Sequence, residues 1–292
     1  MTSRLAVAAG ASAAIIVGAS VPVTGMLQDY PLLTGQAMRY TLSGLVLLAW
    51  TYARGQRPAP PKLADVPALL ALVAFGMLGF TAVVLYSQRY AEPGFVAAML
   101  GGTPIVLALA SRQRSRTTVV GAGIVALGVV VLSGGGAWRG PGLVLAALAL
   151  CGEAAFTLFA VGVVRRLGGV SVATWACFIA GGVGAVLGTF VGGWQVPTPR
   201  EVLALVVLAI VLTAVAFGLW YFAVGRLGAD RAGVLIGLMP ISGLVVSVSL
   251  GAQDFKLLAL AGAAVVAVGC VVGLSSGRVR PRAGTVEPVP AR

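Results

Sequence analysis

One glutamate stands in the middle of a long apolar stretch. Glu153, in LALCGEAAFTLFA, is the only acidic residue near the centre of such a stretch. A carboxylate at the middle of a bilayer costs several kcal/mol unless it is protonated, paired or hydrated, so it tends to face a cavity and mark function. We therefore take Glu153 as the first candidate for a solute or ion pathway. The alternative is a neutral carboxyl group that hydrogen-bonds across a helix interface.

Arg39 and two prolines are further candidates for the pathway. Arg39 lies about four helical turns before Arg54, a position from which its long side chain can reach the outer headgroups. Pro104 and Pro240 each free a backbone carbonyl, which lipid tolerates only when that carbonyl is buried or faces a wet cavity. Their helices either meet at such a cavity or are kinked for packing alone.

Three aromatic residues lie near the ends of apolar stretches. Trp220 and Tyr221 follow Gly218, and Tyr86 lies near the equivalent place in an earlier stretch. Rings of this kind line apolar solute pockets or form the aromatic belt at a membrane surface. Both interpretations remain open at this point.

A row of glycines indicates close helix packing. Gly184, Gly188 and Gly192 recur at four-residue spacing, and small residues at that spacing let two helices approach closely. A face this smooth also allows helices to slide past each other.

The residue types exclude several kinds of soluble chemistry. The sequence has no histidine, so imidazole metal ligands and histidine-assisted nucleophiles are absent, and it has no GxSxG or phosphate-binding loop. Cys151, Cys177 and Cys270 lie far apart inside apolar stretches and are interpreted as core residues. We expect no catalytic site, no metal and no cofactor.

The composition requires lipid as the solvent for most of the chain. Charged residues make up 10% and hydrophobic residues 59% of the 292 residues, with 41 glycines in addition. Too few polar residues remain to cover a soluble domain. The net charge of +12 comes from short basic clusters between apolar runs, which favours membrane orientation over nucleic acid as its role.

The charged residues divide the chain into ten predicted spans. A helix of about 20 residues crosses a hydrocarbon core of about 30 Å. The uncharged runs of that length are 5–28, 66–88, 93–111, 117–138, 202–225, 232–253 and 257–277. Three more helices fit at 32–53, at 141–164 around Glu153, and at 169–193. The first run resembles a signal peptide, but its removal would leave nine spans, so we expect it to be retained.

The basic residues predict the orientation of the ten helices. With the N-terminus in the cytoplasm, fifteen of the 20 Lys and Arg residues fall in cytoplasmic segments and five in external segments or near an outer helix end. Cytoplasmic loops are the ones enriched in these residues. We expect a multi-pass protein of the cell membrane with both termini in the cytoplasm.

An internal repeat agrees with this topology. The string GAGIVALG at 121–128 returns as GAAVVAVG at 262–269, and Pro104 in MLGGTPIVLAL corresponds to Pro240 in LIGLMPISGLV. Consecutive units of five helices enter the membrane from opposite sides, an arrangement typical of secondary transporters. The predicted fold is therefore all-α and integral to the membrane, with two inverted five-helix repeats at 4–136 and 141–277. A disordered cytoplasmic tail is expected at 278–292.

Long stretches of both halves resemble one transporter family. The second repeat of EamA-type proteins, of the drug/metabolite transporter superfamily, resembles AFGLWYFAVGRLGADRAGVLIGLMPISGLVVSVSLG at 216–251 and the following LAGAAVVAVGCVVGL. The first repeat resembles LYSQRYAEPGFVAAMLGGTPIVLALA at 85–110 and the later GAGIVALGVVVL. Arg39, in AMRYTLSGLVLL, matches the Arg-aromatic pair that begins the family's second helix. This resemblance implies a structural or anion-attracting role for Arg39 as the alternative to a side chain at the headgroups.

The chain departs from the family in two places. Where the family commonly carries Gly-Glu after the proline-containing helix, the second half reads Gly251-Ala252-Gln253-Asp254, and the first half is shortened to 111–114. A role of that glutamate therefore does not transfer to this chain. The first helix also lacks the family's tryptophan-glycine start and reads IIVGASVPVTGM.

These observations favour transport over two other functions. The leading hypothesis is a secondary transporter, and by resemblance an exporter, that moves a small organic metabolite or drug-like solute by alternating access, with Glu153 coupling it to protons. A membrane enzyme would need more polar residues at membrane depth than one carboxylate, and a structural or assembly protein would not need Glu153. The expected partners are the solute, the lipid bilayer and protons, with a second copy of the chain as a further candidate and no nucleic acid.

Overall fold

The computed structural model describes residues 2–110, 116–133, 138–227, 232–233 and 235–274, and these residues are mostly helical. The expected tail at 278–292 lies outside the described residues. The helices of the first half are α1 (Thr2–Gly25), α2 (Leu32–Ala53), η1 (Leu63–Asp65), α3 (Val66–Ala71), η2 (Leu72–Gly79), α4 (Phe80–Ser87), α5 (Pro93–Leu100), α6 (Thr103–Ala110) and α7 (Arg116–Ser133). Those of the second half are α8 (Gly142–Leu167), α9 (Gly169–Val191), α10 (Pro199–Val207), η3 (Leu208–Val215), α11 (Ala216–Leu227), η4 (Leu235–Leu238), α13 (Met239–Ser249) and α14 (Leu257–Leu274).

Several of these helices are long and apolar enough to cross a membrane. By length and composition alone, five of them meet this condition: Arg4–Gly25, Leu63–Ser87, Gly142–Leu167, Gly169–Val191 and Pro199–Leu227. Four shorter apolar helices accompany them: Pro93–Leu107, Val119–Leu132, Leu235–Ser249 and Leu257–Val272. The predicted all-α membrane fold is confirmed.

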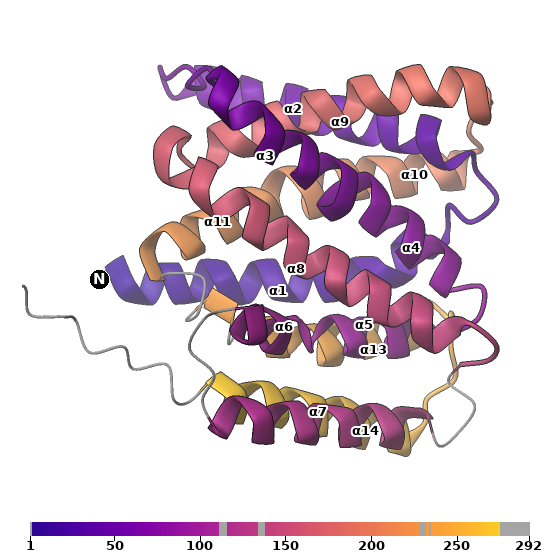
Figure 1. The fold of residues 1–292 in the computed structure, drawn as a ribbon. Helices are drawn as coiled ribbons and strands as arrows, with labels where there is room; N and C mark the ends of the chain where they lie inside the picture. Colours follow the sequence, from indigo (N-terminus) through magenta and orange to yellow (C-terminus); the bar gives the residue numbers. More distant parts are fainter. Residues whose placement is uncertain (1, 111–115, 134–137, 228–231, 234, 275–292) are drawn as a thin grey trace, which may run out of the picture.

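Each half packs mainly against the other half. α2 packs against α9 at one edge of the molecule, and α7 packs against α14 at the opposite edge (Figure 1). Between these pairs, α1 lies against α11 and α13, while α8 lies against α4, η2 and α5. Equivalent helices of the two halves therefore either pack on each other, as α2 does on α9 and α7 on α14, or make corresponding contacts with the other half, as α1 and α8 do. Two inverted repeats related by one axis require this arrangement.

The third and eighth spans share two further features. In each, a carboxylate accepts a hydrogen bond from the backbone three residues earlier: Lys62 N–H to Asp65 at 2.9 Å, and Thr198 N–H to Glu201 at 2.7 Å. Such a carboxylate satisfies a backbone donor that has no helical partner. Farther along, both spans widen into an eight-residue π-helix, η2 and η3. π-Helical segments are rare and are frequently found at functional sites.

The fourth and ninth predicted spans are broken near their prolines. α5 ends at Leu100 and α6 begins at Thr103, because Pro104 has no N–H to donate to the carbonyl four residues earlier. The Thr103 hydroxyl donates to that Leu100 carbonyl instead, at 2.7 Å. In the second half, the 3-10 helix η4 precedes α13 at the equivalent place.

Glycines allow the paired helices to approach closely. On α9, a Cβ added at Gly184 would lie 3.0 Å from the Leu33 carbonyl oxygen of α2, and one at Gly188 would lie 3.1 Å from the Thr34 nitrogen. Gly192 follows the last residue of α9 and is its C-cap. The strings that reveal the repeat pack on each other in the same way, since a Cβ at Gly262 of α14 would lie 2.8 Å from the Leu132 nitrogen of α7.

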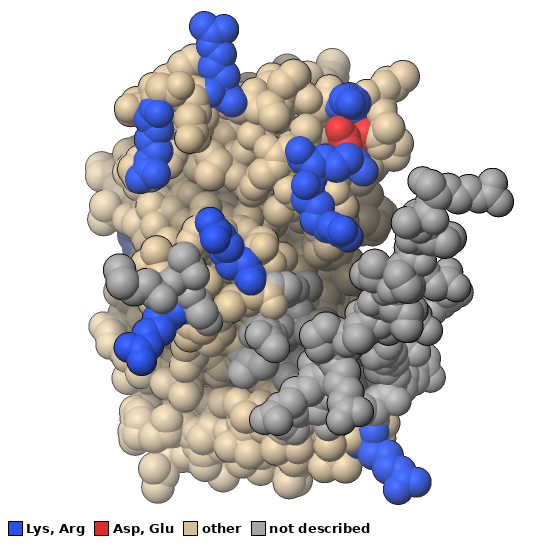
Figure 2. Space-filling view, turned by 90° about the vertical axis from the view of Figure 1, so that its left-hand side faces the viewer, with Lys and Arg blue, Asp and Glu red and all other residues tan. Residues whose placement is uncertain are grey.

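One end of the molecule is strongly basic. Figure 2 shows the end at which the chain begins, where Lys and Arg side chains are spread over the surface and acidic side chains show at one place. α2 ends and α8 ends at this face, so it receives Arg54, Arg165 and Arg166. We refer to it below as the N-terminal face.

Candidate functional site

A small cavity lies between the two halves. Its walls come from α1, α2, the η2–α4 and η3–α11 spans, α8 and α13. The lining residues are Ala13, Ala14, Val17, Arg39, Tyr40, Gly76, Phe80, Glu153, Phe156, Leu212, Ala216, Phe217, Trp220 and Met239. The volume open to the centres of water molecules is about 40 Å³, which is room for roughly three waters. The cavity must widen before an organic solute fits.

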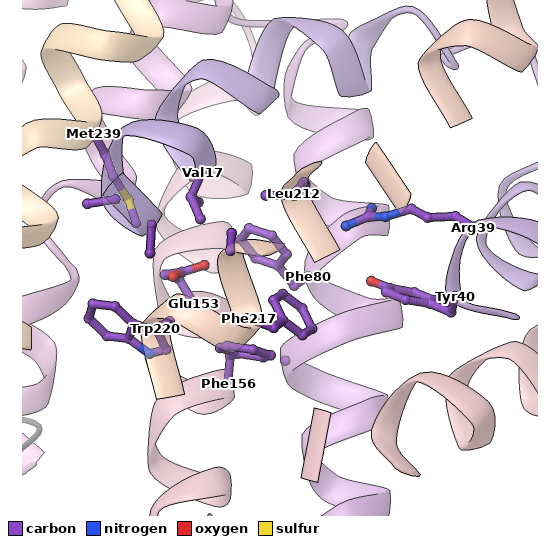
Figure 3. A pocket seen from close by; sticks show the side chains of 14 residues that line it. Val17, Arg39, Tyr40, Phe80, Glu153, Phe156, Leu212, Phe217, Trp220 and Met239 are labelled. Carbon is purple, nitrogen blue, oxygen red and sulfur yellow. The ribbon is translucent and has the colours of Figure 1, made fainter. Parts of the chain in front are cut away.

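Glu153 points into this cavity from the middle of α8. Its side chain is buried, with 8% of the residue exposed, and it lies near Trp220 and Phe217 (Figure 3). Within the described part of the chain, its carboxyl group has neither a hydrogen-bond donor nor a basic side chain as partner. A buried carboxyl group without a partner is costly.

Arg39 enters the same cavity from α2. It is 4% exposed, its Nε donates to Thr213 Oγ1 at 3.0 Å, and its Nη1 donates to Gln36 Oε1 at 3.1 Å. The guanidinium carbon also lies 4.8 Å from the centre of the Tyr40 ring, a favourable place for a cation. The side chain is therefore held inside the protein, and the alternative in which it reaches the headgroups is not what the structure shows.

The three predicted aromatic residues have different surroundings. Trp220 lines the cavity, and Tyr221 stacks on Phe156 behind it, with ring centres 5.4 Å apart. The Trp220 Nε1 and the Tyr221 hydroxyl are buried and have no hydrogen-bond partner among the described residues. Tyr86 is 52% exposed at the end of α4, where its ring lies 5.2 Å from the guanidinium carbon of Arg89. Tyr86 is therefore a surface residue and does not line the cavity.

The two prolines do not line the cavity. Pro240 packs against Gly101, at the break between α5 and α6, and its neighbour Met239 reaches the cavity. Pro104 lies next to Gly233. The structure thus joins the prolines to the contact between the halves, while Glu153, Arg39 and Trp220 share the cavity itself.

Several lining residues were missed in the sequence. Phe156 lies three residues after Glu153, so helical periodicity alone places it on the same face. Tyr40 directly follows Arg39. Phe80 and Phe217 carry no such signal, because the π-helical turns that precede them are not visible in the sequence.

No metal site accompanies this arrangement in the described residues. Among them, no group of three or more His, Cys, Asp or Glu side chains is placed to hold an ion. The two ion pairs seen there, Asp65–Arg166 and Glu92–Lys256, lie near the ends of helices and away from the cavity lining.

The cavity lies between two inverted helical halves, an arrangement typical of secondary transporters. The model of the EamA-like transporter family matches twice, at residues 4–134 and 140–274, so the chain belongs to this family. It is similar to the "Uncharacterized transporter YetK" of Bacillus subtilis (strain 168), with 25% identity over 280 residues that cover 90% of this chain and 83% of that protein.

A solved structure has the same fold. It is described only as a crystal structure of a protein, and it superposes with a TM-score of 0.70 over 91% of this chain and 95% of its own. The sequences are 21% identical, so this likeness concerns the fold alone. The predicted family is confirmed by the two matches of the family model.

Proposed function

We propose that this protein exports a small organic solute across the cytoplasmic membrane by alternating access of its two halves. The observation that carries the proposal is the cavity between the halves, with the unpaired Glu153 in its wall. The basic N-terminal face supports a cytoplasmic position for both termini, because cytoplasmic surfaces are the ones rich in Lys and Arg.

We also propose that Glu153 couples the solute to a proton. A carboxyl group in this wall is stable when it is protonated or when it is paired with a cation, and less stable when it is charged and alone. The proton and a cationic group of the solute therefore compete for the same carboxyl. Release of one on binding of the other links their movement in opposite directions.

The test compares Glu153→Gln with Glu201→Gln. The first variant keeps the shape of the side chain and removes its titration, whereas the second changes an exposed helix cap away from the cavity. Metabolites are measured inside and outside cells that lack the protein or overproduce each form. We expect the parent and Glu201→Gln to raise one or more external solutes, and Glu153→Gln to lose this accumulation.

Proteoliposomes then test the coupling itself. The solute found in cells is loaded, and its efflux is followed at several values of external pH. The parent should show efflux that depends on the pH gradient, and Glu153→Gln should retain only exchange that ignores the gradient. Unchanged pH dependence in Glu153→Gln would contradict coupling through this residue, and identical metabolites in all cells would contradict export.

A further inference from the structure

We propose that the cavity selects a zwitterionic solute whose cationic and anionic groups lie at opposite ends of an apolar body. The amine end faces Glu153 and the anionic end faces Arg39. This inference rests on the proposed function, since it names the class of solute that the same cavity would carry.

The Arg39 end of the cavity offers donors for an anion. A guanidinium group has five N–H donors, and the structure uses one of them on Thr213 and one on Gln36. Arg39 lines both the main cavity and a smaller neighbouring one of about 20 Å³, and within the described residues no carboxylate pairs with it. A buried cation of this kind gains most from an anion that binds through several N–H groups at once.

The Glu153 end offers the opposite charge. Its carboxyl group is an acceptor without a donor in the described residues, and the Trp220 ring lies beside it (Figure 3). An aromatic face next to a carboxylate stabilises an ammonium group from two sides. The cavity therefore has one buried negative group and one buried positive group, and neither neutralises the other.

The apolar wall between the two charges sets their separation in the solute. In Figure 3, Phe80, Phe217 and Leu212 lie between Arg39 and Glu153. A solute with both charges on neighbouring carbons can satisfy only one end and leaves the other charge buried and unpaired, which is costly. A solute with an apolar body between its charges satisfies both ends and covers the rings.

Binding measurements on purified protein in lipid nanodiscs test this inference with defined probes. ε-Aminocaproate and norleucine are isomers that differ only in where the amine sits, while caproate and hexylamine each carry one of the two charges. γ-Aminobutyrate and ω-aminocaprylate vary the length of the body. We expect an ω-amino acid of this series to bind at least about tenfold more tightly than norleucine, caproate and hexylamine, because each charged contact contributes more than one factor of ten.

Variants assign each end of the probe. Glu153→Gln should reduce the affinity for the best ω-amino acid to that for the simple acid, and Arg39→Gln should reduce it to that for the simple amine. The comparison of the isomers in the parent protein needs no variant, so it decides the matter even if Arg39→Gln does not fold.

Two outcomes would overturn the inference. Norleucine binding as tightly as every ω-amino acid would show that the charges need not be separated, and caproate or hexylamine binding equally well would show that only one end matters. Neither result would contradict the proposed export, which is tested separately by the comparison of metabolites inside and outside cells. Absence of export with preserved selectivity for ω-amino acids would instead contradict the proposed function and leave the binding site standing.

Discussion

Two buried threonine hydroxyl groups beside the cavity have different surroundings. Thr213 Oγ1 accepts the hydrogen bond from Arg39 and donates to the Leu208 carbonyl of its own π-helix, at 2.9 Å. The Thr157 hydroxyl, on α8 one turn after Glu153, has no partner among the described residues. Removal of these two groups should therefore have different consequences.

Thr213→Val should destabilise the protein and Thr157→Val should not. The first change leaves a buried guanidinium group without one of its acceptors, which we expect to lower the free energy of unfolding by about 1–2 kcal/mol. The second replaces an unsatisfied hydroxyl by a methyl group of the same shape, which is nearly neutral or slightly stabilising. Thermal unfolding of the purified variants in one detergent provides the measurement. Equal melting temperatures for the two variants would contradict the role given to Thr213.

At the scale of elements, the packing of α7 on α14 depends on glycines that leave no room for a side chain. A Cβ at Gly262 would lie 2.8 Å from the Leu132 nitrogen and 2.9 Å from the Gly128 oxygen, both of them backbone atoms. A Cβ at Gly123 of α7 would meet nothing within 4 Å. The two positions thus form a matched pair for the same substitution.

Gly262→Ala should destabilise the protein by about 1–3 kcal/mol, because the two helices must move apart. Gly123→Ala should stay within about 0.5 kcal/mol of the parent. Both are measured by thermal unfolding and by size-exclusion profiles in detergent. A loss of stability in Gly123→Ala as large as that in Gly262→Ala would show that the helix pair is not held by close backbone contact.

Polar contacts join the halves at both faces of the molecule. At the N-terminal face, Arg166 at the end of α8 pairs with Asp65, and the Trp175 Nε1 of α9 donates to the Ala59 carbonyl at 2.9 Å. At the opposite face, Lys256 Nζ lies 2.7 Å from a Glu92 carboxylate oxygen. The Gln253 side chain accepts the Gly94 N–H at 2.7 Å beside that pair.

We expect these two ion pairs to break in turn as the cavity opens to either side. In a background whose three cysteines are replaced by alanine, Met239→Cys places one thiol in the cavity wall. Adding Arg166→Gln should raise its reactivity toward an impermeant maleimide applied from the N-terminal face, and adding Glu92→Gln should raise it from the opposite face. Equal effects of both variants from both sides would show that the pairs only add stability.

At the scale of the whole molecule, the charge distribution predicts its orientation. Gly55 follows α2 at the N-terminal face, and Pro197 lies in the loop between α9 and α10. In the same cysteine-free background, a cysteine at Pro197 should react with an impermeant reagent in intact cells, and a cysteine at Gly55 should react only after the cells are opened. The reverse pattern would overturn the proposed orientation.

The sequence predicted the fold better than the site. The ten spans follow from the spacing of charged residues, and the repeat follows from small-residue strings that prove to be the contact between α7 and α14. Glu153 stood out because a carboxylate in an apolar helix is costly. Thr213, one of the two acceptors of Arg39, could not be found in this way, since it belongs to the other half and lies in a π-helical turn.

Contacts between residues of the first half and residues of the second half also have a consequence for synthesis of the protein. The Arg39–Thr213 bond joins residues 174 positions apart. At a ribosomal rate of roughly 5–20 residues per second, Thr213 is made about 9–35 seconds after Arg39. We expect α2 to enter the membrane during that interval without α9, its main neighbour, and before Arg39 can bond to Thr213. We therefore expect biogenesis of this protein to be sensitive to anything that delays translation between the two halves, because the charge of Arg39 lacks this partner until the second half is made.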